Sequence, residues 1–253
     1  MESEFLRWLR PRLPAHPQLR LGPGDDAALL RLADRRDGVV TVDLLSDGVD
    51  FELTRLHDPR RIGHKALGVN LSDLAAMAAE PVAAVVALLL PRGDADDPLA
   101  GMSLAQSLYE GMLPLAERYG VAIAGGDTNT WQGPLAISVT AIGQTTARGP
   151  LLRSTARPGD RILVTGRFGG SILGRHLDVE PRIHEALLLN DRYELHGGLD
   201  CSDGLARSLA NVRGERLRRG TRFRPHSDRV RSVRVGEDSK RRRLRAGTRT
   251  PRR

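Results

Sequence analysis

The chain has 253 residues, of which 40% are hydrophobic, and it carries a formal net charge of +8. This length allows one large or two modest domains, and no apolar run approaches the twenty residues of a transmembrane helix. The N-terminal "MESEFLRWLRPRLP" lacks the apolar centre of a signal peptide, and the single cysteine, Cys201, excludes an internal disulfide and a cysteine-rich zinc site. We therefore expect a cytoplasmic protein without membrane association.

The positive charge is concentrated in the last part of the chain. Residues 213–253 contain 17 Lys and Arg against 4 Asp and Glu, which leaves 22 basic and 27 acidic residues in 1–212. This basic segment has few apolar residues and no periodicity, so we expect it to be disordered. We interpret it as the product of an altered reading frame near 205–213. A basic arm that binds nucleic acid through phosphates is the less favoured alternative.

The hydrophobic pattern predicts strands and helices in alternation over the first part of the chain. Asp58 and Pro59 supply a cap and a first position for the first helix, and Pro114 should kink or break the second. The predicted elements are a strand at 38–45, a helix at 58–78, a strand at 81–91, a helix at 98–120, and strands at 121–127 and 134–144. This order indicates an α/β (α+β) layer fold.

The pattern restarts near residue 148. We expect a strand that ends at Gly166, a helix from about Gly169, another near 182–190, and a loop leading into a helix in "GGLDCSDGLARSLANV". The predicted organisation is therefore a two-domain one. Its parts are an N-terminal domain at 1–147, a partial second α/β domain at 148–212 and the basic segment at 213–253.

Aspartates recur at turns and at the ends of predicted elements. Singly, each is more often a cap or turn residue than a ligand. When several aspartates lie at the ends of successive elements of an α/β sheet, they can converge on one face. Their carboxylate oxygens can then bind Mg²⁺, and Mg²⁺ in turn binds nucleotide phosphates. The aspartates concerned are Asp25, Asp26, Asp43, Asp73, Asp127, Asp200 and Asp203.

Other nucleotide-binding patterns fit less well. "GPGDDA" matches G-x-G-x-x-A, and Asp43 follows at about the distance of a ribose ligand, but a pyrophosphate docked there would face Asp25 and Asp26. The P-loop pattern is absent, so ATP would be held through metal bridges. The histidines show no zinc spacing, and Ser202 has no evident histidine partner.

Several long motifs occur together: "GPGDDAAL", "KALGVNLSDLAAMAAEP", "AGGDTN", "RSTARPGDRILVTG" and "DCSDGL". In this order and spacing the chain resembles the thiamine-monophosphate kinase family, over roughly residues 1–212. The resemblance places it in the superfamily of aminoimidazole ribonucleotide synthetase, selenophosphate synthetase and a hydrogenase maturation factor. It implies direct in-line transfer of the γ-phosphoryl group of ATP to thiamine phosphate, assisted by several Mg²⁺ ions and needing no nucleophilic side chain.

The resemblance also implies roles for individual residues. The implied metal ligands are Asp26, Thr41 through its hydroxyl, Val42 through its backbone carbonyl, Asp43, Asp73, Asp127, Asp200 and Asp203. The implied ATP contacts are Gly126, Asp127, Arg153, Ser202 and Tyr109, and Asp50 is the implied substrate contact. Asp25 is expected to shape the loop. A further implication is a homodimer in which the N-terminal sheets of two subunits join into a barrel, with ATP along the dimer cleft.

The chain departs from the family after "SDGL", where relatives continue with further strands and helices and a "GGEDYEL"-type motif. Other enzymes of the superfamily remain alternatives. Selenophosphate synthetase would require a reactive cysteine or selenocysteine near its N-terminus and the maturation factor a C-terminal cysteine, and this chain has neither. A truncated, inactive nucleotide-binding homologue is the non-catalytic alternative.

Overall fold

The strands of the described residues form one sheet in the order β1-β2-β3-β6-β4-β5. The computed structural model describes residues 19–21, 25–31, 36–54, 58–93, 97, 99–167 and 169–212. The strands are β1 (Leu19–Leu21), β2 (Ala28–Arg31), β3 (Asp37–Ser46), β4 (Ala79–Pro91), β5 (Ala122–Trp131) and β6 (Ala136–Thr145). β4 and β5 are parallel and every other neighbouring pair is antiparallel.

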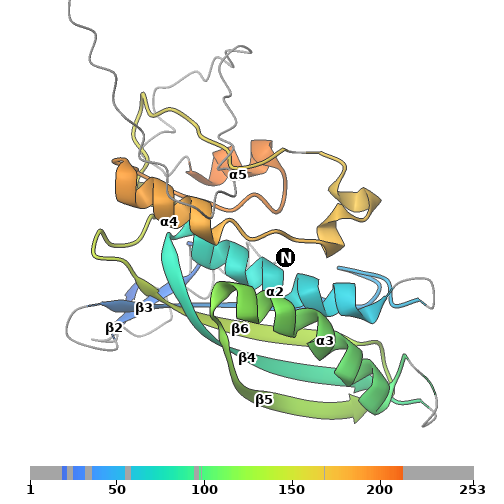
Figure 1. The fold of residues 1–253 in the computed structure, drawn as a ribbon. Coiled ribbons are helices and arrows are strands. Elements are labelled where there is room, and N and C mark those ends of the chain that lie inside the picture. The colour runs from blue at the N-terminus through green and yellow to red at the C-terminus, as the bar shows by residue number, and fades with distance from the viewer. Residues whose placement is uncertain are drawn as a thin grey trace, which may run out of the picture.

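Among the described residues, four α-helices and three short 3₁₀ turns accompany the sheet. The helices are α2 (Pro59–Ala76), α3 (Gly101–Tyr119), α4 (Ile183–Arg192) and α5 (Leu205–Val212), and the turns are η2 (Arg153–Thr155), η3 (Ser171–Leu173) and η4 (Arg175–Leu177). Helices α2 and α3 cover one face of the sheet, and α3 connects the parallel strands β4 and β5 (Figure 1). This arrangement confirms the predicted α/β class. No helix in the described ranges is both long and apolar enough to span a bilayer.

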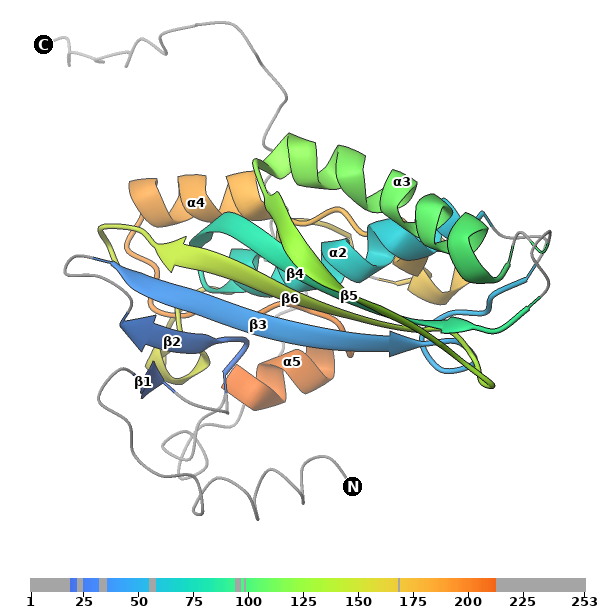
Figure 2. The ribbon, with the colours of Figure 1, turned by 90° about the horizontal axis from the view of Figure 1, so that it is seen from below.

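The core lies between the sheet and α2 and α3. Along β3, Val39, Thr41 and Leu45 are buried beneath the helices, whereas Val42 and Leu44 are 60% and 68% exposed on the other side. The register aligns Val42 with Thr140 of β6 and, through it, with Val85 of β4, which is also exposed. We call the side carrying these apolar residues the open face. Figure 2 views the molecule from this side, with β3 and β6 in front of α2.

The start of α2 follows the sequence prediction. The Asp58 side chain accepts a hydrogen bond from the Arg60 backbone N–H at 3.0 Å, and Pro59 occupies the first turn, where its missing N–H costs nothing. Helix α3 runs without interruption through Pro114, so the predicted break is wrong. Pro114 faces solvent, where water can satisfy the carbonyl that loses its helical partner.

Two predictions after residue 148 are wrong. The segment 161–166 forms no extended strand, because only Val164 makes an isolated β-bridge, and Ile162 and Leu163 are partly exposed. The helix expected from Gly169 is replaced by η3 and η4. Gly169, Gly170 and Gly174 have φ values of 98°, 69° and 107°, a left-handed conformation that precedes η3 and separates it from η4. Helices α4 and α5 confirm the two remaining predictions. The basic segment 213–253 lies outside the described residues.

Candidate metal and nucleotide site

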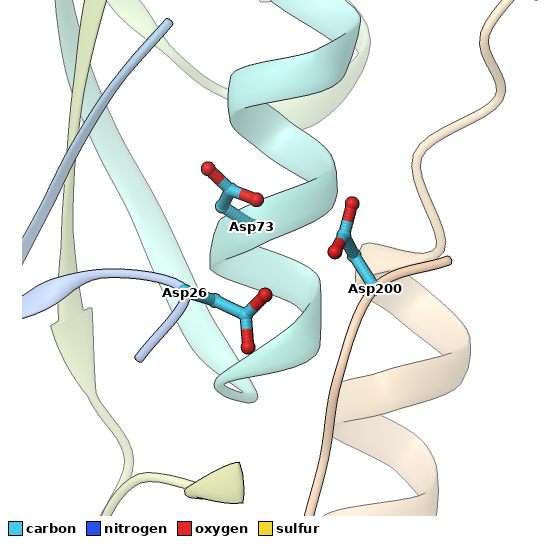
Figure 3. A group of neighbouring side chains, drawn as sticks. All are labelled: Asp26, Asp73 and Asp200. Atoms are coloured by element: carbon cyan, nitrogen blue, oxygen red, sulfur yellow. The ribbon is translucent and has the colours of Figure 1, made fainter. Parts of the chain in front are cut away.

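Three aspartates from distant parts of the sequence converge beside α2. Asp26 lies two residues before β2, Asp73 lies in the last turn of α2, and Asp200 lies in the loop before α5 (Figure 3). One carboxylate oxygen of each lies within 4.8 Å of the others. We call this group the carboxylate cluster. It is the only such group of acidic, histidine or cysteine side chains within the described ranges.

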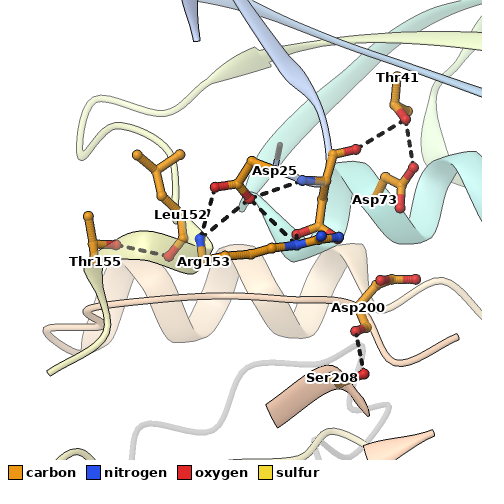
Figure 4. Close-up of polar contacts among 9 residues, drawn as sticks. Asp25, Thr41, Asp73, Leu152, Arg153, Thr155, Asp200 and Ser208 are labelled. Atoms are coloured by element: carbon orange, nitrogen blue, oxygen red, sulfur yellow. Dashed lines mark hydrogen bonds and ion pairs between the residues drawn. The ribbon is translucent and has the colours of Figure 1, made fainter. Parts of the chain in front are cut away.

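Strand β3 adds two further oxygen-bearing side chains to this region. Because alternate residues of a strand share a face, Thr41 and Asp43 both point toward α2. The Thr41 hydroxyl donates to an Asp73 carboxylate oxygen at 2.6 Å (Figure 4). Asp43 lies close enough to Asp73 for its charge to raise the pKa of that carboxyl group. The structure therefore brings Thr41 and Asp43 together with the carboxylate cluster.

Asn70 fixes the backbone of β3 at this point, and the sequence reasoning missed it. Its side-chain oxygen accepts the Asp43 backbone N–H at 3.1 Å, and its amide nitrogen donates to the Ala66 carbonyl at 3.0 Å. Asn70 is fully buried. The sequence signal for this role is the position of Asn70 one helical turn before Asp73, on the same side of α2. An amide buried there needs hydrogen-bond partners, and the neighbouring strand supplies one.

Burial and mutual repulsion make the acids hard to ionise. Desolvation is the main cause that raises the pKa of Asp73 to about 8, with added repulsion from Asp43, Asp200 and Asp26 that the Thr41 hydrogen bond partly offsets. Burial, followed by the charge of Asp26, raises the pKa of Asp200 to about 7. Burial, followed by Asp50, also raises the pKa of Asp43. A cation among these groups would relieve both penalties, and hard oxygen donors suit Mg²⁺.

Arg153 joins the carboxylate cluster through Asp26. Its Nε donates to Asp26 Oδ2 at 2.7 Å, and its Nη2 contacts the other carboxylate oxygen. The Arg153 backbone N–H also donates to Asp25 Oδ2 at 3.0 Å (Figure 4). The predicted nucleotide contact therefore lies beside the predicted metal ligands, and the side-chain hydrogen bond to Asp26 raises the pKa of its guanidinium group.

The predicted residues of β5 and α3 lie apart from the carboxylate cluster. Gly126 is paired with Val86, and a Cβ at Gly126 would lie 1.8 Å from the Val86 carbonyl oxygen, so this strand pairing requires glycine. Asp127 is exposed and aligns with the open-face Leu44 through β4 and β6. Tyr109 is half-buried against the core.

The remaining predicted residues lie on loops or on the open face. Asp203 and Ser202 are exposed before α5, and Asp203 pairs with Arg207 at 3.3 Å. Val42 directs its side chain to the open face. Asp50 accepts the Ser46 backbone N–H at 2.8 Å in the loop after β3, and its carbonyl oxygen contacts Nζ of the buried Lys65.

Comparison with known proteins identifies the family. Residues 24–145 match the model of the AIR synthase related protein, N-terminal domain. The thiamine-monophosphate kinase of Rhodopirellula baltica is 44% identical over 218 residues, which cover 83% of this chain and 66% of that protein. The thiamine-monophosphate kinase of Bacillus subtilis is 33% identical over 83% of this chain and 69% of its own length. The chain belongs to the thiamine-monophosphate kinase family.

A solved structure agrees with this assignment. The structure of AaThiL complexed with AMPPCP and TMP superposes with a TM-score of 0.70 at 25% sequence identity, covering 83% of this chain and 69% of that one. The match to the Rhodopirellula thiamine-monophosphate kinase covers just under two thirds of that relative's length. The described sheet and the carboxylate cluster are thus those of a thiamine-monophosphate kinase family member that matches only part of its relatives.

Proposed function

We propose that this chain is a thiamine-monophosphate kinase, which transfers the γ-phosphoryl group of ATP to thiamine phosphate and yields thiamine diphosphate and ADP. The observation that carries the proposal is the carboxylate cluster with the Thr41 hydroxyl, on a chain of this family. The AaThiL structure, with AMPPCP and TMP bound, supports the same pair of substrates. The curated relatives named above are all thiamine-monophosphate kinases, so the other superfamily activities are not favoured.

The residues of the carboxylate cluster fit Mg²⁺. Asp26, Asp73 and Asp200 would hold the ions, with Thr41 and Asp43 beside them, and the donors are oxygen atoms as Mg²⁺ prefers. Bound Mg²⁺ would neutralise the repulsion between two phosphate groups that must approach each other. The chain's own contribution is to position the oxygen donors in a poorly solvated region and to place Arg153 beside them for phosphate oxygens.

The remaining predicted contacts stay part of the proposal. We propose Val42, Asp127 and Asp203 as further metal ligands, Gly126, Ser202 and Tyr109 as nucleotide contacts and Asp50 as a substrate contact. The proposed organisation keeps an N-terminal domain at 1–147 and a partial second domain at 148–212. The cytoplasmic location also stays a proposal, supported by the single cysteine.

We also propose that the protein is a homodimer that pairs the open faces of two sheets. Val42, Leu44 and Val85 are 60%, 68% and 38% exposed there, and apolar side chains gathered on one face of a sheet favour association. Asp127 lies on the same face, so pairing would bring it close to the second copy. In such a dimer Asp127, which lies away from the carboxylate cluster of its own chain, could bind metal at the site of the second copy.

The decisive test incubates the purified full chain with ATP, Mg²⁺ and thiamine phosphate and measures thiamine diphosphate by chromatography. We expect product from the wild type and its loss in Asp73→Asn, because that change removes one of the three carboxylates of the cluster, the one that the Thr41 hydroxyl contacts. Asp178→Asn, an exposed acid paired with Arg61, is the matched control and should retain activity. Intact ATP binding without product would favour the inactive homologue, and full turnover by Asp73→Asn would refute the metal assignment.

A further inference from the structure

The guanidinium group of Arg153 engages both carboxylate oxygens of Asp26. Nε donates to Oδ2 at 2.7 Å, and Nη2 contacts Oδ1. The Asp26 side chain has no exposed surface, whereas that of Arg153 is 25% exposed. A planar guanidinium that bridges two carboxylate oxygens is among the strongest pairings between protein side chains. The solvent side of this buried acid is therefore covered by one arginine.

Asp25 fixes the backbone from which Arg153 extends. One of its oxygens accepts the Arg153 backbone N–H at 3.0 Å, and the other accepts the Asp26 backbone N–H at 2.9 Å. A single carboxylate thus ties Asp26, two residues before β2, to Arg153 at the start of η2, 127 positions later. Arg153 Nε also forms an ion pair with Asp25 Oδ1 at 3.8 Å. Because both hydrogen bonds to Asp25 have backbone donors, the Arg153 side chain can leave Asp26 while the two segments stay joined.

A divalent cation bound by Asp26 must compete with this guanidinium. Both positive groups need the same two oxygens, Mg²⁺ requires a nearly ideal set of ligands, and two cations on one carboxylate repel each other. The other acids of the carboxylate cluster lie within 4.8 Å of Asp26, and within the described ranges no arginine forms a hydrogen bond or ion pair with their side chains. Direct competition for oxygen atoms therefore occurs at Asp26, although the charge of Arg153 also favours the ionised form of Asp200.

We propose that Arg153 is exchanged for Mg²⁺ at Asp26, so that cation binding frees the guanidinium for phosphate oxygens, while Asp25 is the positioning residue that keeps Arg153 at the site. This inference rests on the proposed function, since it takes Asp26 as a metal ligand and Arg153 as a phosphate contact. Because coupling is reciprocal, an anion that holds Arg153 away from Asp26 strengthens cation binding. The exchange thereby couples the arrival of nucleotide phosphate to the loading of metal.

The test measures Mn²⁺ binding to the full chain without nucleotide, by the loss of the electron paramagnetic resonance signal of free Mn²⁺. Arg153→Gln removes the competitor, so we expect Mn²⁺ to bind about tenfold more tightly than to the wild type. Arg148→Gln removes the same charge five positions earlier, where Arg148 donates to the exposed Tyr193 carbonyl, and should leave the affinity unchanged. Equal affinities of wild type and Arg153→Gln, or equal tightening by both variants, would overturn the exchange.

A double-mutant cycle locates the competition. In an Asp26→Asn background, Arg153→Gln should no longer tighten Mn²⁺ binding, whereas persistent tightening would show that the competition lies elsewhere. Arg153→Lys retains the charge but cannot bridge two oxygens, so an affinity between those of wild type and Arg153→Gln is expected, and it keeps the test valid if glutamine impairs folding. The wild-type affinity in Arg153→Lys would count against the exchange.

The positioning role of Asp25 has its own spectroscopic readout. Addition of Mg²⁺ should shift the Arg153 Nε–H resonance, identified by its loss in Arg153→Lys, and Asp25→Asn should move the starting position of this resonance toward that of a solvated arginine. An unchanged resonance in both experiments would refute the proposal. Failure of the kinase assay with these effects intact would refute only the proposed function, and an active kinase without them would refute only the exchange.

Discussion

Thr41 supplies a neutral hydroxyl that hydrogen-bonds a carboxylate of the cluster. Its hydroxyl donates to Asp73 at 2.6 Å and favours the ionised form of an acid that burial otherwise keeps protonated. One neutral group therefore offsets part of the burial that keeps this carboxylate from the charged form that a cation needs.

Replacement of this hydroxyl tests its role. In Thr41→Val we expect a loss of about 1 kcal/mol in the free energy of unfolding and about tenfold weaker Mn²⁺ binding. Chemical denaturation and the Mn²⁺ titration measure the two effects. Thr145→Val is the matched control, because that buried threonine accepts the Asp37 backbone N–H at 3.1 Å on the same sheet. It should lose stability without losing cation affinity, and an equal loss of affinity in both variants would contradict the role of Thr41.

The raised pKa values of Asp73 and Asp200, about 8 and about 7, predict a pH dependence of stability. Both groups bind protons more tightly when folded than when unfolded, where their pKa is about 4. Their stabilising contribution is therefore complete below about pH 4 and is lost as the pH rises through about 7 to 8. In EDTA, the thermal midpoint should fall across this range.

Saturating Mg²⁺ should reduce this fall, because a cation favours the ionised carboxylates. Thermal melts followed by circular dichroism at a series of pH values measure the slope with EDTA and with Mg²⁺. Asp73→Asn removes one of the titrating groups and should flatten the slope in EDTA. The same slope in Asp73→Asn and wild type would show that Asp73 does not cause the dependence.

At the scale of elements, α2 and α3 approach each other through two glycines. A Cβ at Gly63 would lie 1.9 Å from the Leu108 carbonyl oxygen, and one at Gly111 would lie 1.8 Å from the Arg60 carbonyl oxygen. Neither helix backbone can yield locally, so any side chain at these positions must separate the helices. Because α2 carries Asp73, this contact also affects how the carboxylate cluster is placed relative to the sheet.

Gly63→Ala should therefore lower the free energy of unfolding by about 1–3 kcal/mol, although alanine has the better helix propensity. Urea denaturation followed by circular dichroism measures the change. Gln106→Ala, at an exposed position of α3, should be close to neutral. Wild-type stability in Gly63→Ala would mean that the helices can separate without loss of packing.

The elements predicted from sequence are those whose pattern is local. β3, α2, β4, α3 and β6 each carry enough residues for a period of two or of 3.6 to be visible, and the cap at Asp58 lies within two residues of its partner. β1 and β2 were not predicted, because "LRL" and "ALLR" become strands only through pairing with their neighbours. The turns at η3 and η4 depend on the left-handed conformation of Gly170 and Gly174, which an apolar pattern does not encode.

The candidate site was predictable in its chemistry more than in its geometry. Asp26, Asp73 and Asp200 all lie in quoted motifs, but their approach to within 4.8 Å depends on packing between segments up to 174 positions apart, which no local pattern encodes. The pairing of Arg153 with Asp26 is of the same kind. Asp127, on the open face, is the residue whose predicted role depends most on the assembly of the whole molecule.

At the scale of the whole molecule, the two sides of the sheet differ sharply. One side is packed against α2 and α3, and the open face exposes Val42, Leu44 and Val85 without a covering helix in the described ranges (Figure 1). An apolar face of this kind gains free energy when it is buried, and a second copy of the same sheet offers a matching surface. The assembly is therefore testable with one charge placed at the centre of β3.

Leu44→Glu places this charge on the open face, where burial against a second copy would leave it without a partner. We expect the dimer dissociation constant to rise by at least about tenfold, as measured by sedimentation velocity at a series of concentrations. Leu113→Glu makes the same change on the outer side of α3, where leucine is 50% exposed, and should leave the dimer intact. A monomeric wild type, or equal dissociation of both variants, would refute pairing through the open face. If the dimer also completes the site with Asp127, the nucleotide affinity of Leu44→Glu should fall as its dimer dissociates. The thermal midpoint of Leu44→Glu at low protein concentration should match that of the wild-type monomer.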